Sequence, residues 1–213
     1  MTPQPITHHI DDALLMAYSA GNLPEAFSLA VATHISMCDE CRATLESFDA
    51  VGGQVIEDQD PVTMNDDAFA KTMAMVGKQS VQRPKPANDI PSVLVGYIGG
   101  SLDDVEWRAL GGGIKQKIIM TGRDATARLL YIPAGKSAPD HGHSGIELTL
   151  VLRGAFKDDS GQYHAGDIEI TDELVEHTPI ASEGEDCICL AVTEAPIRFT
   201  SFFYRALQPF FKI

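Results

Sequence analysis

The 213-residue chain has few cysteines and few basic residues, and both shortages exclude classes of protein. Four cysteines are too few for a disulfide-built scaffold of this length. Sixteen lysines and arginines stand against 30 aspartates and glutamates, so the formal net charge is −14. Surfaces that bind nucleic acid or anionic lipid need clustered Lys and Arg, so we expect no direct nucleic-acid partner and no membrane partner.

Long apolar runs are also missing, although 44% of the residues are hydrophobic. No run approaches the ~20 residues of a membrane-spanning helix. The N-terminus, MTPQPITHHIDD, has neither the basic start nor the apolar centre of a signal peptide. We therefore expect a cytoplasmic protein with enough apolar residues for a hydrophobic core.

A proline-containing stretch separates two parts with different patterns. Residues 79–91 contain three prolines and little hydrophobic periodicity, which is typical of an extended linker. We place the linker at residues 81–98, between an N-terminal domain at 1–80 and a C-terminal domain at 99–213. The expected fold class is α+β multidomain, with a small helical bundle followed by an all-β barrel.

The first part carries helical patterns. Its first helix is expected to end near Gly21, and Pro24 suits the first turn of a second helix. A third helix is expected at residues 39–51, ended by the pair Gly52–Gly53, and a fourth at 65–78. Four short helices make a thin core, so this half is expected to need a further stabilising element such as a metal ion.

The second part carries short strands separated by Gly, Pro and Asp, a pattern typical of a sandwich or barrel. In one of these strands Cys187 and Cys189 share a face. They are either an oxidisable pair or two small buried hydrophobic residues, and the second interpretation is favoured. The expected strands cover residues 126–132, 147–152, 167–170, 187–192 and 197–203.

His34, Cys38 and Cys41 form an H-x3-C-x2-C motif. Residues four apart on a helix share a face, so His34 and Cys38 can converge, and Cys41 can close on the same ion. Imidazole and thiolate ligands suit tetrahedral zinc, which needs a fourth ligand. His8 and His9 lie just before the first helix, and antiparallel helix packing would return one of them to the motif. The alternative is a buried cysteine pair beside a surface histidine.

The motif, the upstream histidine and the helical segment resemble the zinc-binding domain of the ChrR family of anti-sigma factors, over residues 5–80. In that family the domain inserts between the two domains of an extracytoplasmic-function sigma factor and covers its polymerase-binding surfaces. The resemblance implies such a sigma factor as the partner and Zn²⁺ as the metal, with His8 as the fallback for His9. The zinc ligands that it implies are His9, His34, Cys38 and Cys41.

Phe69, Met73 and Val76 form a stripe on the fourth expected helix. This stripe either faces the sigma factor or packs inside the chain, and both alternatives stay open. Charge favours a basic partner: residues 1–90 contain 5 basic and 13 acidic residues, a net of −8, whereas residues 91–213 contain 11 and 17, a net of −6. An acidic inhibitor has an electrostatic reason to meet the basic surfaces of a sigma factor.

A second group of metal-ligating residue types begins at His141. His141 and His143 are two apart on a strand and face the same way, and Glu147 is a further even step along. Together with His177, which follows a later turn, they would supply three imidazoles and one carboxylate to a divalent metal. The alternative is a metal-free barrel whose interior histidines are hydrogen-bonded.

The spacing G-x5-H-x-H-x3-E-x6-G resembles the first cupin motif, and residues 100–205 resemble a single cupin barrel. In the second motif Gly166 and His177 are correctly spaced, but the usual Pro, Gly and Asn are replaced. The replacing residues are Asp172, Leu174 and Ala181. Zinc, iron, manganese and nickel serve such sites across cupins, and the Irving–Williams order favours zinc over iron or manganese. The expected ligands are His141, His143, Glu147 and His177.

The two resemblances together imply an anti-sigma factor rather than an enzyme. Its N-terminal domain would sequester the sigma factor, and its cupin domain would release it under stress. Oxidative stress, including singlet oxygen, is the signal that the ChrR resemblance implies. The alternative function is a cupin metal-dependent dioxygenase or isomerase with a small zinc-stabilised accessory domain.

Overall fold

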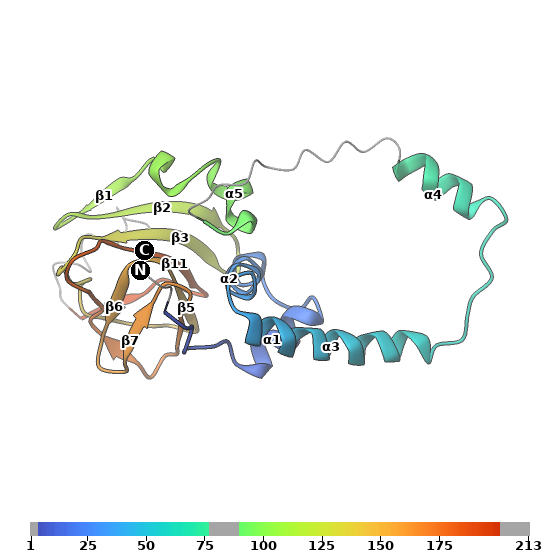
Figure 1. Ribbon diagram of the computed structural model, residues 1–213, viewed down its shortest axis with the longest axis horizontal. Helices are drawn as coiled ribbons and strands as arrows, with labels where there is room; N and C mark the ends of the chain where they lie inside the picture. Colours follow the sequence, from blue (N-terminus) through green and yellow to red (C-terminus); the bar gives the residue numbers. More distant parts are fainter. Residues whose placement is uncertain (1–3, 77–89, 201–213) are drawn as a thin grey trace.

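A computed structural model describes residues 4–76 and 90–200 of the chain (Figure 1). Helices come first and strands follow, so the expected fold class is confirmed. No helix within these two ranges is long and apolar enough to cross a lipid bilayer. The helices are α1 (Asp12–Ser19), α2 (Glu25–Ile35), α3 (Asp39–Glu57), α4 (Ala68–Val76) and α5 (Ser92–Ile98).

A six-stranded antiparallel sheet in the order β1-β2-β3-β11-β5-β8 forms one wall of the barrel. Its strands are β1 (Arg108–Gly111), β2 (Ile114–Thr121), β3 (Thr126–Ile132), β11 (Cys187–Thr193), β5 (Glu147–Arg153) and β8 (Ile168–Thr171). Two three-stranded sheets complete the barrel, in the orders β10-β6-β7 and β12-β4-β9. Their strands are β10 (Ile180–Ala181), β6 (Ala155–Lys157), β7 (Gln162–His164), β12 (Arg198–Phe199), β4 (His141–Gly142) and β9 (Glu176–His177).

The strand expected at 197–203 is short. Only Arg198–Phe199 pair as β12 within the described chain, and residues 201–203 lie outside it. The other expected strands appear within a residue of their expected bounds, because short runs rich in Val, Ile and Leu that are bounded by turn residues mark a strand directly.

The main hydrophobic core lies outside the barrel, between the six-stranded sheet and the helices. Side chains alternate between the two faces of a strand, so Leu148 and Leu150 of β5 face outward together with Leu190 of β11. Helix α2 packs across this face and buries Phe27, and α5 adds Leu94 to the same cluster. One continuous core therefore joins the N-terminal helices to the barrel.

The inward face of the same sheet carries polar groups. Arg128 of β3, Glu147 of β5 and Glu169 of β8 are all buried on this side. Because buried charges are costly unless paired or bound to metal, the barrel interior is the place to look for a site.

Helix α3 runs through Gly52–Gly53, so the expectation that this pair ends the helix is wrong. Both glycines keep a negative φ, and the helix continues to a C-cap at Asp58. A glycine in a helix costs only about 1 kcal/mol relative to alanine, which a 19-residue helix tolerates.

Residues 92–98, expected to belong to the linker, instead form α5. Pro91 acts as its N-cap, and Gly99 ends it in the left-handed conformation with φ 82°. Leu94 and Val95 are buried in the hydrophobic core, and Val93 packs against it, although prolines precede this helix in the sequence.

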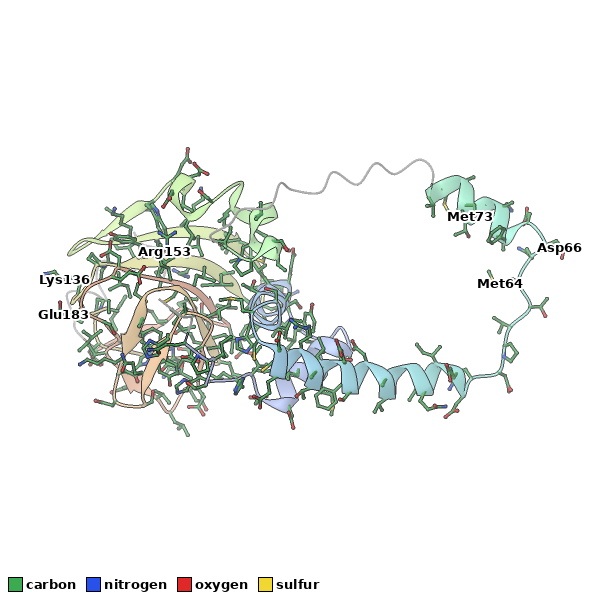
Figure 2. The ribbon with its side chains drawn as sticks, viewed as in Figure 1. Met64, Asp66, Met73, Lys136, Arg153 and Glu183 are labelled. Atoms are coloured by element: carbon green, nitrogen blue, oxygen red, sulfur yellow. The ribbon has the colours of Figure 1, made fainter. Side chains whose placement is uncertain are left out.

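Residues 51–76 stand away from the rest of the fold, and we call them the apolar arm (Figure 1). They comprise the end of α3, an extended connection and α4, in which no residue is buried. Met64 and Met73 project from the apolar arm into open space (Figure 2). Phe69, 78% exposed, does not pack inside the described chain, so the structure favours the outward alternative for this stripe. The exposed apolar side chains of the arm are Val51, Val55, Ile56, Val62, Met64, Phe69, Met73, Met75 and Val76.

Replacing Gly52 or Gly53 with alanine is expected to stabilise α3 by about 0.5–1 kcal/mol each, because a Cβ at either position meets nothing within 4 Å. Hydrogen exchange of the α3 amides measures this local free energy. Gly21→Ala is the control: its Cβ also meets nothing, but φ is 69°, so alanine is expected to destabilise the chain. Unchanged protection in both α3 variants would contradict the prediction.

Candidate metal centres

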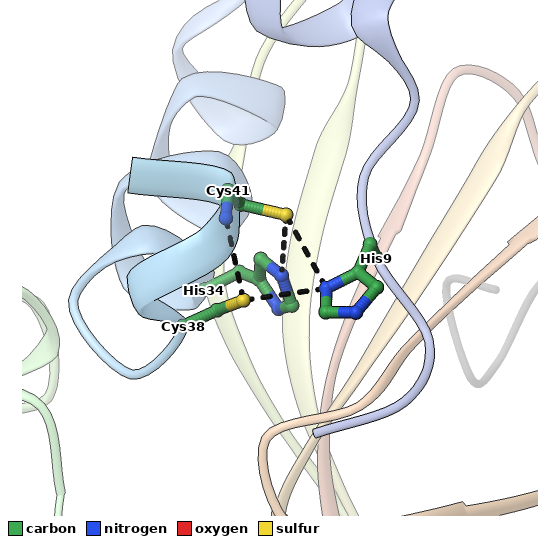
Figure 3. Close-up of side chains that lie close together, drawn as sticks. All are labelled: His9, His34, Cys38 and Cys41. Atoms are coloured by element: carbon green, nitrogen blue, oxygen red, sulfur yellow. Dashed lines mark hydrogen bonds between the residues drawn. The ribbon is translucent and has the colours of Figure 1, made fainter. Parts of the chain in front are cut away.

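The structure brings His9, His34, Cys38 and Cys41 together at the base of α3 (Figure 3). One ligand atom of each lies within 4.8 Å of the others. His34 Nε2 is 3.3 Å from Cys41 Sγ, and His9 Nδ1 lies 3.3 Å from Cys38 Sγ and 3.7 Å from Cys41 Sγ. Four ligands around a tetrahedral zinc ion are separated by about 3.6 Å, so this set fits the ion.

Local backbone structure explains why the two cysteines face the same point. Cys38 is the N-cap of α3, and its Sγ accepts from the backbone N–H of Cys41 at 3.5 Å. The cap is thus itself a member of the cluster, and Asp39 is the first residue of the helix. His34 occupies the last turn of α2, one short connection earlier.

The pKa shifts of two residues in this cluster favour a bound cation. Burial lowers the pKa of His34 to about 4, so the ring is neutral and able to bind a metal at neutral pH. Burial raises the pKa of Cys41 to about 11, with the neighbouring Cys38 adding to the effect. Two buried thiolates repel each other, and a divalent cation is the group that would stabilise both.

His9 rather than His8 reaches the two cysteines. The His9 ring also lies near a carboxylate, with Nε2 3.4 Å from Glu40 Oε2, which is the usual partner of a metal-bound imidazole. The His8 ring instead packs against Tyr163 in a tilted arrangement, with ring centroids 4.4 Å apart. His8, the fallback ligand, therefore contacts the barrel and not the cluster.

A second cluster lies inside the barrel and contains His141, His143 and His177, whose ligand atoms are also within 4.8 Å of one another. His141 in β4 pairs with His177 in β9, so the strand pairing itself brings two of the three histidines together. Glu147 adjoins the cluster, with Oε2 2.8 Å from His143 Nδ1. The four expected residues thus meet at one place.

Several polar atoms of this cluster have no hydrogen-bond partner of good geometry among the described residues. They include both ring nitrogens of His143, Nε2 of His177 and Oε2 of Glu147, although the last also makes the close charged contact with His143. Burial alone would raise the pKa of Glu147, but the surrounding histidines outweigh it and lower the pKa. Orphaned nitrogens beside an ionised carboxylate fit a divalent metal.

Sequence reasoning missed Asp158 and Glu169, which flank His177. Asp158 Oδ2 lies 2.8 Å from Nδ1 of His177, and Glu169 Oε1 lies 3.5 Å from the same atom. This leaves Nε2 directed to the histidine cluster, the arrangement in which a carboxylate orients a metal-binding imidazole. Glu169 could have been found from the sequence, because it is a charged residue between Ile168 and Ile170 and faces inward from its strand.

An apolar cavity of about 70 Å³ adjoins the barrel cluster. Its walls include Leu130, Ile132 and Phe199, and His141 and Glu147 border it. A small molecule that reached a metal in the barrel through this cavity would therefore pass mostly apolar side chains.

Cys187 and Cys189 lie deep in the barrel wall, 0% and 2% exposed, with Sγ atoms 3.4 Å apart. The neighbouring Cys187 and burial together raise the pKa of Cys189 well above its usual range. A thiol that resists ionisation is a poor nucleophile, which supports the interpretation as buried hydrophobic residues.

The fold and the two clusters define a cupin barrel that carries a helical domain with a zinc-type His2Cys2 site. A family described as the ChrR cupin-like domain matches residues 97–196. The anti-sigma-E factor ChrR of Cereibacter sphaeroides is 55% identical over 212 residues, which cover 98% of this chain and 99% of the relative. The chain therefore belongs to the ChrR family of anti-sigma factors.

A solved structure is similar over most of its length. The crystal structure of Rhodobacter sphaeroides SigE in complex with the anti-sigma ChrR matches with 53% identity and a TM-score of 0.77. The match covers 88% of this chain and 99% of that chain. The similarity thus includes helices and barrel together.

Cys38→Ser or Cys41→Ser is expected to remove one metal ion per chain and the hydrogen-exchange protection at the base of α3, because structural zinc binding is coupled to folding. Metal analysis and hydrogen exchange measure the two effects. Cys187→Ser, the same substitution in the barrel, is the control and should leave the zinc content of this site unchanged. An unaltered metal content in both α3 variants would refute the assignment.

Asp158→Asn is expected to weaken metal binding by the barrel about 10–100-fold, because the amide cannot hold the His177 ring as the carboxylate does. Competition with a chelator measures this affinity. Asp159→Asn changes the adjacent exposed carboxylate and serves as the matched control. Equal affinities in the two variants would show that Asp158 does not orient His177.

Proposed function

We propose that the chain is an anti-sigma factor that holds an extracytoplasmic-function sigma factor through the apolar arm and the helices ordered by zinc. The arm carries the proposal: exposed apolar side chains on neighbouring elements are typical of a protein-binding surface. Phe69 and Met73 lie one helical turn apart and share a face of α4. A solved relative of this chain is bound to SigE, a sigma factor, which supports the same partner here.

Charge on the arm and its base favours a basic partner. Residues 39–76 contain nine acidic residues and two basic ones. Acidic groups around an apolar stripe guide a basic surface to it and then leave the apolar contacts to hold the complex. A sigma factor binds DNA and therefore has basic surfaces, so it is such a partner. We infer that an anti-sigma factor with this partner acts in the cytoplasm.

We further propose Zn²⁺ at His9, His34, Cys38 and Cys41, where it fixes the base of α3. Two thiolates and two imidazoles are the donors that zinc prefers in structural sites. The barrel site at His141, His143, Glu147 and His177 would hold a divalent metal, with zinc favoured over iron or manganese. The barrel is the proposed sensor, with oxidative stress as its stimulus. Neither the fold nor the relatives favour the alternative of a cupin dioxygenase or isomerase.

A pull-down from the source organism with the full chain is expected to recover a sigma factor. Phe69→Asp with Met73→Asp should weaken the purified complex at least about 100-fold, because buried anchor residues at an interface contribute about 2 kcal/mol or more each. Titration calorimetry measures the affinity. Leu174→Asp is the matched control, since Leu174 is an 85% exposed leucine on the barrel and not on the arm.

Two outcomes would overturn the proposal. One is recovery of RNA polymerase subunits or DNA without a sigma factor. The other is an unchanged affinity of the arm variant for the sigma factor.

A further inference from the structure

The N-terminal segment ahead of α1 lies on the barrel, beside β7 and β5 in the ribbon view (Figure 1). The backbone N–H of Ile168 donates to the carbonyl oxygen of His8 at 3.3 Å. Ile168 begins β8, the outermost strand of the six-stranded sheet. The segment therefore covers an edge that would otherwise be open at this point.

A single buried carboxylate holds this segment. Asp167, 1% exposed, accepts the backbone N–H groups of Thr7 and His8 on Oδ1 at 2.7 and 3.0 Å. Its Oδ2 accepts the backbone N–H of His164 at 2.8 Å. Burial alone would raise the pKa of Asp167, but these three donors outweigh it and lower the pKa, so the carboxylate is ionised. Hydrogen bonds to an ionised acceptor are the stronger kind.

Side chains of the segment add specific contacts with the barrel. Ile6 lies directly over Gly166, where a Cβ would stand 2.6 Å from Ile6 Cδ1. Gly166 has φ 99°, so both the backbone conformation and the close approach require glycine. The His8 ring packs on Tyr163, as described above. Residues 6, 7 and 8 thus each have a partner in the barrel.

The next residue along the chain is His9, the fourth member of the zinc-type cluster. The other three members come from the α2–α3 turn, so the cluster joins two structural units. His9 directly follows His8, whose backbone N–H Asp167 holds, and this leaves little freedom for the His9 ring.

We propose that Asp167 is a positioning residue for the zinc site: the barrel carboxylate fixes the backbone of Thr7 and His8 so that His9 completes the coordination. This inference rests on the zinc site of the proposed function. The barrel thereby contributes to zinc affinity without supplying a ligand. Zinc bound at the base of α3 becomes sensitive to the state of the barrel edge.

The test uses the full chain loaded with cobalt(II), whose thiolate charge-transfer band reports the Cys38–Cys41 site. After addition of EDTA, Asp167→Ala is expected to lose this band about tenfold faster than the wild type, in the range typical for residues that orient metal ligands. Asp167→Asn keeps one acceptor oxygen for Thr7 and His8 and is expected to be intermediate. Asp186→Ala is the matched control: Asp186 also accepts a backbone N–H, that of Ala134 at 3.0 Å, but within the barrel.

A double-mutant cycle separates positioning from general stability. If Asp167 acts through His9, the variant His9→Ala/Asp167→Ala loses cobalt no faster than His9→Ala alone. Additive effects, or equal rates for Asp167→Ala and Asp186→Ala, would overturn the inference. Absence of the thiolate band in the wild-type protein would instead refute the zinc site itself, so the two failures are distinguishable.

Discussion

The polar interior of the barrel is the constraint on which the rest of the structure depends. Histidines and carboxylates occupy part of the space that a small barrel normally fills with apolar side chains. A small apolar cluster that includes Val151 and Cys187 remains inside, but the larger hydrophobic core lies on the other face of the six-stranded sheet, which α2 and α5 cover. The N-terminal helices are thus a structural part of the barrel, and the continuous core fixes where the zinc-type cluster lies.

The two candidate metal centres are joined by a contiguous set of contacts. His177 meets Asp158, Asp158 accepts from Ser160 Oγ at 2.6 Å, and Ser160 lies 2.9 Å from the Tyr163 hydroxyl. The Tyr163 ring then packs on His8, the neighbour of His9. Contiguous packing of this kind is the physical requirement for energetic coupling between distant sites. A ligand or oxidant that altered the barrel centre would therefore have a short route to the base of α3.

Much of this architecture could be predicted from the sequence because its signals are local. The strand at 126–132 is a mostly apolar run bounded by turn residues, and the H-x3-C-x2-C and first cupin motifs place their candidate ligands within a few residues of one another. Non-local features were missed. Asp167 contacts residues about 160 positions away, and no pattern within a window of the sequence reports such a contact.

Other errors came from local preferences that are too weak to break a helix. Gly52–Gly53 has the composition of a helix end, yet the helix continues because nothing requires a positive φ there. The prolines up to Pro91 are typical of a linker, but α5 forms directly after them because Leu94 packs into the hydrophobic core. Composition indicates where a break is allowed; burial decides against it at α5, whereas α3 continues through an exposed stretch without such support.

Helix α3 begins at Cys38, a proposed zinc ligand, and ends beside the exposed surface that would meet the partner. Its 19 residues span about 28 Å at 1.5 Å per residue. A rigid rod of that length converts a tilt of about 10° at its base into a displacement of about 5 Å at its tip. An ion bound at the base would then act as the pivot of a lever, and a small change in its coordination would shift the partner-facing side chains by more than a methyl group's width.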